Sequence, residues 1–101
     1  MAPPWTISRD VLDPGAVPYF NWDAPVTNEA VWRALREGTE DDRVYWIARI
    51  LREAQYCDVW SYLTLRGDVL PRWDAVRPRL GRRRELWDFL LDRWRCDGLL
   101  D

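Results

Sequence analysis

Between residues 39 and 54, the chain repeats apolar side chains with the period of an α-helix. With about 3.6 residues per turn, this repeat places on one helical face Val44, Ile47, Ala48, Leu51 and Ala54. The preceding Thr39 is a good N-cap, and Asp42 stands where the acidic partner of a capping box belongs. An amphipathic helix must bury its apolar face, so we expect the rest of the chain to pack around this one.

The other apolar residues also recur at helical rather than alternating spacing. We predict a helix over 28–37, capped by Thr27 or Asn28 and ended by Gly38, and two short helices over 59–65 and 69–76. A last helix over 82–96 would carry on one face Leu86, Trp87, Leu90, Leu91 and Trp94. No segment alternates as a strand does. The predicted fold is all-α: a compact bundle of about five short helices, whose successive antiparallel members could pack in a HEAT-like manner.

The first 26 residues differ in composition from the rest. They contain five of the seven prolines, which prevent a continuous helix. They also contain large apolar residues, such as Tyr19 and Phe20, which are unfavourable in water. We therefore predict two parts: an irregular, aromatic and proline-rich segment over 1–26 that packs on the body, and a helical domain over 27–101.

Length and hydropathy exclude several classes of protein. The 101 residues are enough for one domain with one core, and 48% of them are apolar, which is typical of a globular chain. Apolar runs reach only about four residues, whereas a membrane-spanning helix needs about 20. The N-terminus has no basic region followed by an apolar stretch, so we expect no secretory signal and a soluble, cytoplasmic protein.

Few residues are available for catalysis or for metal binding. The chain has no histidine and no lysine, and no glycine-rich phosphate loop. The acids Glu40, Asp41 and Asp42 stand at a helix start, where they favour the helix dipole rather than a metal. Asp88 and Asp92 lie one turn apart among arginines, which is typical of surface ion pairs. We predict a protein that is not an enzyme and that has no cofactor and no metal; acid–base catalysis by carboxylates is the least favoured alternative.

Cys57 and Cys96 show no metal-binding or redox spacing. A single disulfide is conceivable, but a cytoplasmic chain would keep both thiols reduced. We expect two small buried or half-buried thiols.

Eight tryptophans are a heavy load for a core of this size. Each indole has roughly 200 Å² of surface to bury. Trp46 and Ile50 lie away from the apolar face of the predicted helix over 39–54, and Phe89 lies outside the face of the last helix. Either the N-terminal segment covers these side chains, or they form an apolar patch that needs a partner.

All fifteen basic residues are arginines, and five of them fall between residues 77 and 84. Residues 66–101 hold nine arginines and seven acids, whereas residues 1–65 hold six and ten, so the C-terminal part is mildly basic. The run Arg82-Arg83-Arg84 could contact an acidic protein surface or phosphates, or lie in solvent at a helix start. A helix-turn-helix is not favoured, because the helix after residue 58 lacks a polar base-reading face.

Three stretches carry a resemblance to a known group of proteins. They are residues 18–23 (PYFNWD), 47–54 (IARILREA) and 58–65 (DVWSYLTL). Together they resemble small uncharacterised bacterial helical proteins encoded beside nucleotidyltransferase-type toxins of abortive-infection systems, over residues 18–80. The resemblance implies an antitoxin-like or accessory role, with a toxin as partner. It implies no functional residue.

From the sequence we therefore predict a non-catalytic interaction protein. Its partner would be another protein, or a second copy of the chain in a homo-oligomer, and nucleic acid is the alternative partner. The tryptophan excess and the absent chemistry motivate this prediction. The predicted partner-binding residues are Trp22, Trp46, Ile50, Arg82, Arg83, Arg84 and Phe89.

Overall fold

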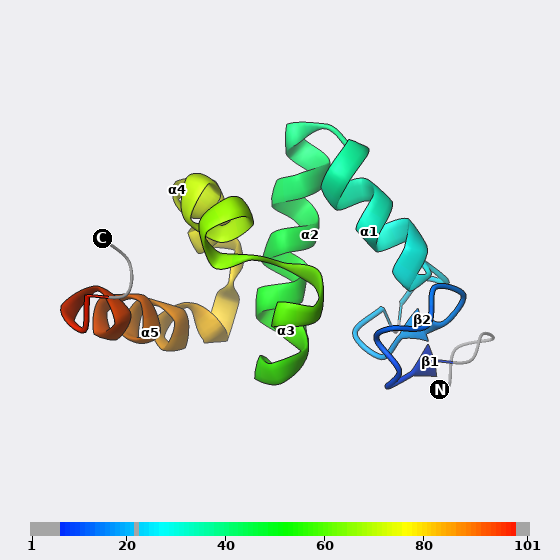
Figure 1. Cartoon of the computed structure of the whole chain (residues 1–101), viewed down its shortest axis with the longest axis horizontal. Helices are drawn as coiled ribbons and strands as arrows, with labels where there is room; N and C mark the ends of the chain where they lie inside the picture. Colours follow the sequence, from blue (N-terminus) through cyan, green and yellow to red (C-terminus); the bar gives the residue numbers. More distant parts are fainter. Residues whose placement is uncertain (1–6, 22, 99–101) are drawn as a thin grey trace.

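The computed structural model describes residues 7–21 and 23–98. These residues form five α-helices, which confirms the predicted all-α fold, and Figure 1 shows their arrangement. No helix among the described residues is both long enough and apolar enough to cross a bilayer. The helices are α1 (Asn28–Glu37), α2 (Glu40–Glu53), α3 (Tyr56–Tyr62), α4 (Trp73–Val76) and α5 (Arg84–Cys96).

Two predicted N-cap residues explain where α1 and α2 begin. Thr27 accepts a hydrogen bond from the Ala30 amide, and Thr39 forms the predicted reciprocal capping box with Asp42. Gly38 separates the two helices in a tight turn. A Cβ at this position would collide with the Ala34 carbonyl of α1 and crowd the Asp42 side chain of α2, so this turn requires a glycine.

Helix α2 is the centre of the core. Its predicted apolar face is buried along its whole length, and α1 packs beside it (Figure 1). Around it lie fully buried side chains from α1, from α3 and from residues 69–80: Val31, Val59, Val69, Val76 and Leu80. Because neighbours surround α2 on more than one side, Arg49 and Ile50 are buried as well.

Residues 63–83 are less regular than predicted. A π-turn η1 (Leu65–Val69), three 3-10 turns, η2 (Leu70–Arg72), η3 (Arg77–Arg79) and η4 (Gly81–Arg83), and the single-turn α4 replace the predicted helix over 69–76. Pro71 and Pro78 each stand in the first turn of a 3-10 segment, where their missing amide costs nothing. The prolines divide the stretch into short turns, which departs from the regular helix pairs of a HEAT-like array.

The N-terminal segment is folded onto the helices. Its strands β1 (Ile7–Ser8) and β2 (Val17–Pro18) form a two-residue parallel pair, with Ile7 opposite Val17. The sequence predicted no strand, because two residues are too few to show alternation. Asn28, fully buried at the start of α1, holds this segment: its Nδ2 donates to the carbonyls of Asp10 and Asp13, at 3.0 and 2.8 Å.

Two more polar groups attach the N-terminal segment to α2 and α3. The guanidinium of Arg49, with 8% of its side chain exposed, donates to the Phe20 carbonyl at 2.8 and 3.2 Å and pairs with Asp23. The Tyr19 hydroxyl donates to Asp58 at 2.6 Å and accepts from the Gln55 amide at 2.7 Å. Burial, together with the hydrogen bond to Asp58, raises the pKa of Tyr19 to about 12, so the hydroxyl stays protonated.

The Asn28 side chain should contribute strongly to stability, because its removal takes a donor from the carbonyls of Asp10 and Asp13 and removes the acceptor of the Tyr62 hydroxyl. We predict that Asn28→Ala lowers the free energy of unfolding by about 2–4 kcal/mol. Chemical denaturation followed by circular dichroism would measure this change. The matched control is Thr27→Ala, which removes only an exposed cap and should cost about 1 kcal/mol. Equal losses in the two variants would contradict the role given to Asn28.

Candidate interaction surface

Helix α5 is attached to the body by one buried indole and one inward-turned guanidinium. Trp87 is 1% exposed, and its Nε1–H donates to the Leu51 carbonyl at 2.9 Å. Arg83 donates to the same carbonyl at 3.4 Å and to the Ala54 carbonyl. The last carbonyls of a helix have no partner within it and carry partial negative charge, so a cation is favoured there. Both contacts fix the start of α5 at the C-terminal end of α2.

An aromatic cluster bridges α3 and α5. Trp60 lies at its centre, with ring centroids 6.0 Å from Tyr56, 6.0 Å from Trp87 and 6.2 Å from Trp94. These rings meet edge to face, the arrangement that favours contact between aromatic quadrupoles. The half-buried Trp60 and Trp94 thus serve mainly to pack the two helices together.

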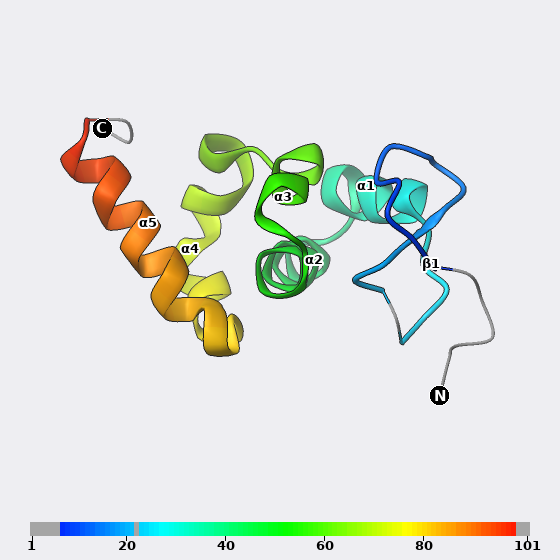
Figure 2. The same cartoon turned by 90° about the horizontal axis from the view of Figure 1, so that it is seen from below.

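The opposite side of α5 has no covering element among the described residues. Leu86 is 46% exposed and Phe89 is 63% exposed, and they are bordered by Leu90, which is half-buried against the core. Residues three and four apart are neighbours on a helix, so these side chains form one continuous patch, which we call the α5 apolar surface. Figures 1 and 2 both show α5 at one end of the molecule, with one side facing away from the other helices.

Unpaired arginines stand at the start of this helix. The exposed guanidinium groups of Arg79, Arg82 and Arg84 form no hydrogen bond or close ion pair with another described residue, although the charge of Arg84 contributes to the lowered pKa of Asp88. Arg77 differs from them, because it holds Asp88 in a two-point ion pair at 2.8 and 2.9 Å. The start of α5 therefore carries free positive charge beside the α5 apolar surface.

The possible catalytic carboxylates are committed to arginines. The hydrogen bond from Arg77 lowers the pKa of Asp88, and Asp92 pairs with Arg95 at 3.3 Å. An Asp held ionised in this way is poorly suited to donate a proton near neutral pH. No cluster of three or more potential metal ligands occurs in residues 7–21 and 23–98. Cys57 and Cys96 are both free and exposed, which corrects the expectation of buried or half-buried thiols.

The structure separates the predicted partner-binding residues. Phe89, Arg82 and Arg84 are exposed on or beside the start of α5, as expected. Arg83 is not part of that surface, because its side chain turns inward to the carbonyls of α2. Sequence adjacency gave no sign of this difference, since the acceptors of Arg83 are main-chain groups about 30 residues earlier.

The α2 candidates do not join the α5 apolar surface. Of the two alternatives for Ile50, the structure shows burial: it is 0% exposed, because α2 is surrounded in the core, so it is not at the surface as a partner-binding residue would be. Trp46 is half-buried against the core, with its ring edge-to-face on Tyr45 at 5.1 Å. Trp22 lies outside the described residues.

The apolar side chains exposed on α5 are not the tryptophans that we expected, but a leucine and a phenylalanine. Among the six described tryptophans, Trp87 is buried and the other five are half-buried. Leu86 was predicted to lie on the buried face of α5, but it is exposed. The spacing of Trp87, Leu91 and Trp94 could have shown this, because that row fills the buried side and leaves Leu86 outside it. The half-buried tryptophans are Trp32, Trp46, Trp60, Trp73 and Trp94.

Neither a protein-family model, nor a curated protein, nor a solved structure matches this chain.

The three neighbouring arginines should differ in their effect on stability. We predict that Arg83→Ala lowers the free energy of unfolding by about 1–3 kcal/mol, because two carbonyls at the end of α2 lose a charged donor. Arg82→Ala and Arg84→Ala, as matched controls, should change it by less than about 0.5 kcal/mol. Thermal and chemical unfolding of the three variants would test this, and a similar loss in all of them would contradict the assignment.

Proposed function

We propose that this chain is a non-catalytic interaction protein that docks one protein partner on the α5 apolar surface. The proposal depends on one observation: Leu86 and Phe89, three residues apart and therefore neighbours on the surface of α5, are both exposed beside arginines that form no hydrogen bond or close ion pair. The complementary partner would offer an apolar pocket with carboxylates at its rim. Phe89 would fill the pocket, and Arg82 would meet the rim.

The energetics of this arrangement favour binding. Burial of a large apolar side chain contributes about 1.5–3 kcal/mol, so Leu86 and Phe89 could together supply a substantial part of an affinity. Rim arginines add mainly association rate and specificity. The absence of histidine and lysine from the whole sequence favours binding over catalysis as the role of this chain.

The resemblance over residues 18–80 supports a toxin as the partner. In this proposal, the helical body is the scaffold shared with the antitoxin-like group, and α5, which lies outside the resemblance, provides the contact specific to this chain. The chain would act in the cytoplasm of a bacterium, where the exposed thiols of Cys57 and Cys96 would stay reduced.

Substitution of the α5 apolar surface should abolish docking without loss of fold. We predict that Leu86→Ser with Phe89→Ser weakens binding to the product of the adjacent gene at least tenfold, measured by co-purification and titration calorimetry. The matched control is Leu12→Ser, which changes a more exposed apolar residue in the N-terminal segment (71% exposed) and should leave binding unchanged. Circular dichroism should be the same for all variants.

Two results would overturn this proposal. One is unchanged binding by the double variant. The other is a wild-type dimer in light scattering that becomes monomeric in the double variant, because the occupant of the surface would then be a second copy of this chain.

A second candidate function is nucleic-acid binding, favoured by the three exposed guanidinium groups without partners at the start of α5. Guanidinium forks fit phosphate oxygens well, and the helix start adds positive potential. In this alternative Arg79, Arg82 and Arg84 would bind the backbone of a single or double strand.

The salt dependence of binding distinguishes this alternative. We predict that Arg79, Arg82 and Arg84 changed together to alanine would reduce the slope of log affinity against log salt by about 2–3, since each phosphate contact contributes about 0.7–0.9. The control, Arg93→Ala with Arg95→Ala, removes charge at the other end of α5, where both arginines are paired with aspartates. A triple variant that binds an oligonucleotide like the wild type would exclude this function.

A further inference from the structure

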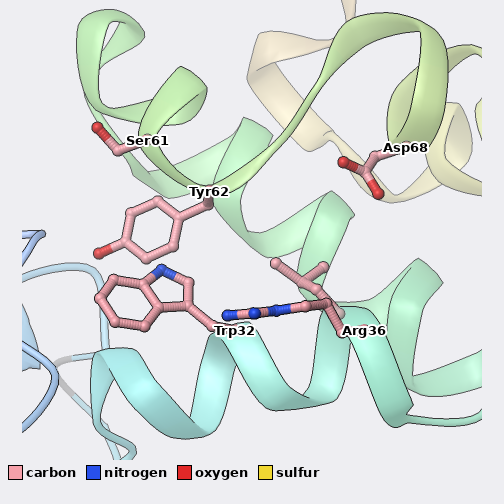
Figure 3. A pocket seen from close by; sticks show the side chains of 6 residues that line it. Trp32, Arg36, Ser61, Tyr62 and Asp68 are labelled. Carbon is pink, nitrogen blue, oxygen red and sulfur yellow. The ribbon is translucent and has the colours of Figure 1, made fainter.

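A second candidate site lies between α1 and α3. It is an open pocket of about 520 Å³, within the usual range for small-molecule sites. In both Figure 1 and Figure 2, α2 and α3 lie between α1 and α5, and no residue of α5 lines the pocket, so it is separate from the α5 apolar surface. Its lining, drawn in Figure 3, consists of Trp32, Leu35, Arg36, Ser61, Tyr62 and Asp68.

Two aromatic rings form one wall. The centroids of Trp32 and Tyr62 are 6.4 Å apart, and their planes are inclined by 40°. The Tyr62 ring is held in place, because its hydroxyl donates to the buried Asn28 Oδ1 at 2.5 Å. Burial raises the pKa of Tyr62, so the hydroxyl stays protonated and continues to donate this hydrogen bond. A fixed aromatic wall of this kind suits the flat face of a ring in a ligand.

Arg36 supplies an uncommitted cation at the same pocket. Its guanidinium forms no ion pair or hydrogen bond with another described residue, and Figure 3 shows it pointing along α1 toward the Trp32 indole. The nearby Glu29 is already paired with Arg33 at 2.8 Å. All five N–H donors of Arg36 are therefore free for a phosphate or carboxylate, and the planar fork matches either group.

Asp68 places a negative charge on the side of the pocket opposite Arg36. Its Oδ2 accepts from the Thr64 amide at 2.8 Å and from the Thr64 hydroxyl at 3.2 Å, so the carboxylate is fixed. Figure 3 shows Asp68 on the other wall from Arg36. A negative group of a ligand is attracted to the Arg36 side and repelled from the Asp68 side, so the orientation of a bound anion is determined.

We propose that this pocket binds a small aromatic anion, with its flat ring against Trp32 and Tyr62 and its phosphate or carboxylate on Arg36. The two anionic groups have the same recognition chemistry here, and they correspond to two sources: a nucleotide or a free aromatic carboxylic acid. This site is independent of the docking surface on α5.

The test uses the full chain and four probes. Adenosine 5′-monophosphate and indole-3-acetate combine a ring with an anion, whereas adenosine and inorganic phosphate each lack one of the two. We expect at least one of the first two to bind at least tenfold more tightly than adenosine or phosphate in calorimetry. It should also shift the indole N–H signal of Trp32 in nuclear magnetic resonance spectra, assigned by its loss in Trp32→Phe. The probe that binds identifies the source.

Matched arginine variants on α1 test the geometry. Arg36→Gln should weaken the bound probe at least tenfold, while Arg33→Gln, one turn away from it by sequence and paired with Glu29, should change affinity less than twofold. Both side chains are exposed, so both variants should keep the wild-type circular dichroism spectrum. The proposal is overturned if neither ring-bearing anion binds, if the two variants weaken binding equally, or if the shifted signals belong to α5.

Discussion

The last turn of α2 and the link to α3 hold both ends of the chain through hydrogen bonds. On one side, Arg49 and the Gln55 amide bind the N-terminal segment through Phe20 and Tyr19. On the other side, the Leu51 and Ala54 carbonyls receive the donors of α5. Helix α2 therefore does more than fill the core with its apolar face. Its C-terminal end is the place where an irregular, proline-rich segment and a separate helix become parts of one molecule.

Besides the arginines that pair with surface carboxylates, two groups of arginines differ in what surrounds them. Arg49 and Arg83 are turned inward, where their several donors satisfy carbonyls that would otherwise be unpaired. Arg36, Arg82 and Arg84 have no such partners among the described residues. The same residue type thus fixes the architecture in one setting and leaves charge available on two separate surfaces in the other. This division gives the candidate docking surface and the candidate pocket their positive character.

Local signals predicted the first half of the helical body well and the second half less well. The helices over 28–37 and from 40 onward begin at Thr27 and Thr39 because both caps are completed by neighbours in sequence. Periodicity could not show that Ile50 is buried, since it identifies one apolar face and not how many neighbours surround a helix. The pocket was also beyond reach: Trp32 and Arg36 are one turn apart, but Ser61, Tyr62 and Asp68 join them only in the folded chain.

The way α5 is anchored has a consequence for how the sequence can change. Trp87 and Arg83 donate hydrogen bonds to main-chain carbonyls at the end of α2, and every residue type has the same main-chain carbonyl. Side chains of α2 can therefore vary with little chemical effect on this joint, whereas an added or deleted residue in α2 would rotate the carbonyls away from both donors. The attachment of α5 should therefore tolerate substitutions in α2 but not insertions or deletions. The exposed face of α5 can then change toward new partners independently of the side chains of α2.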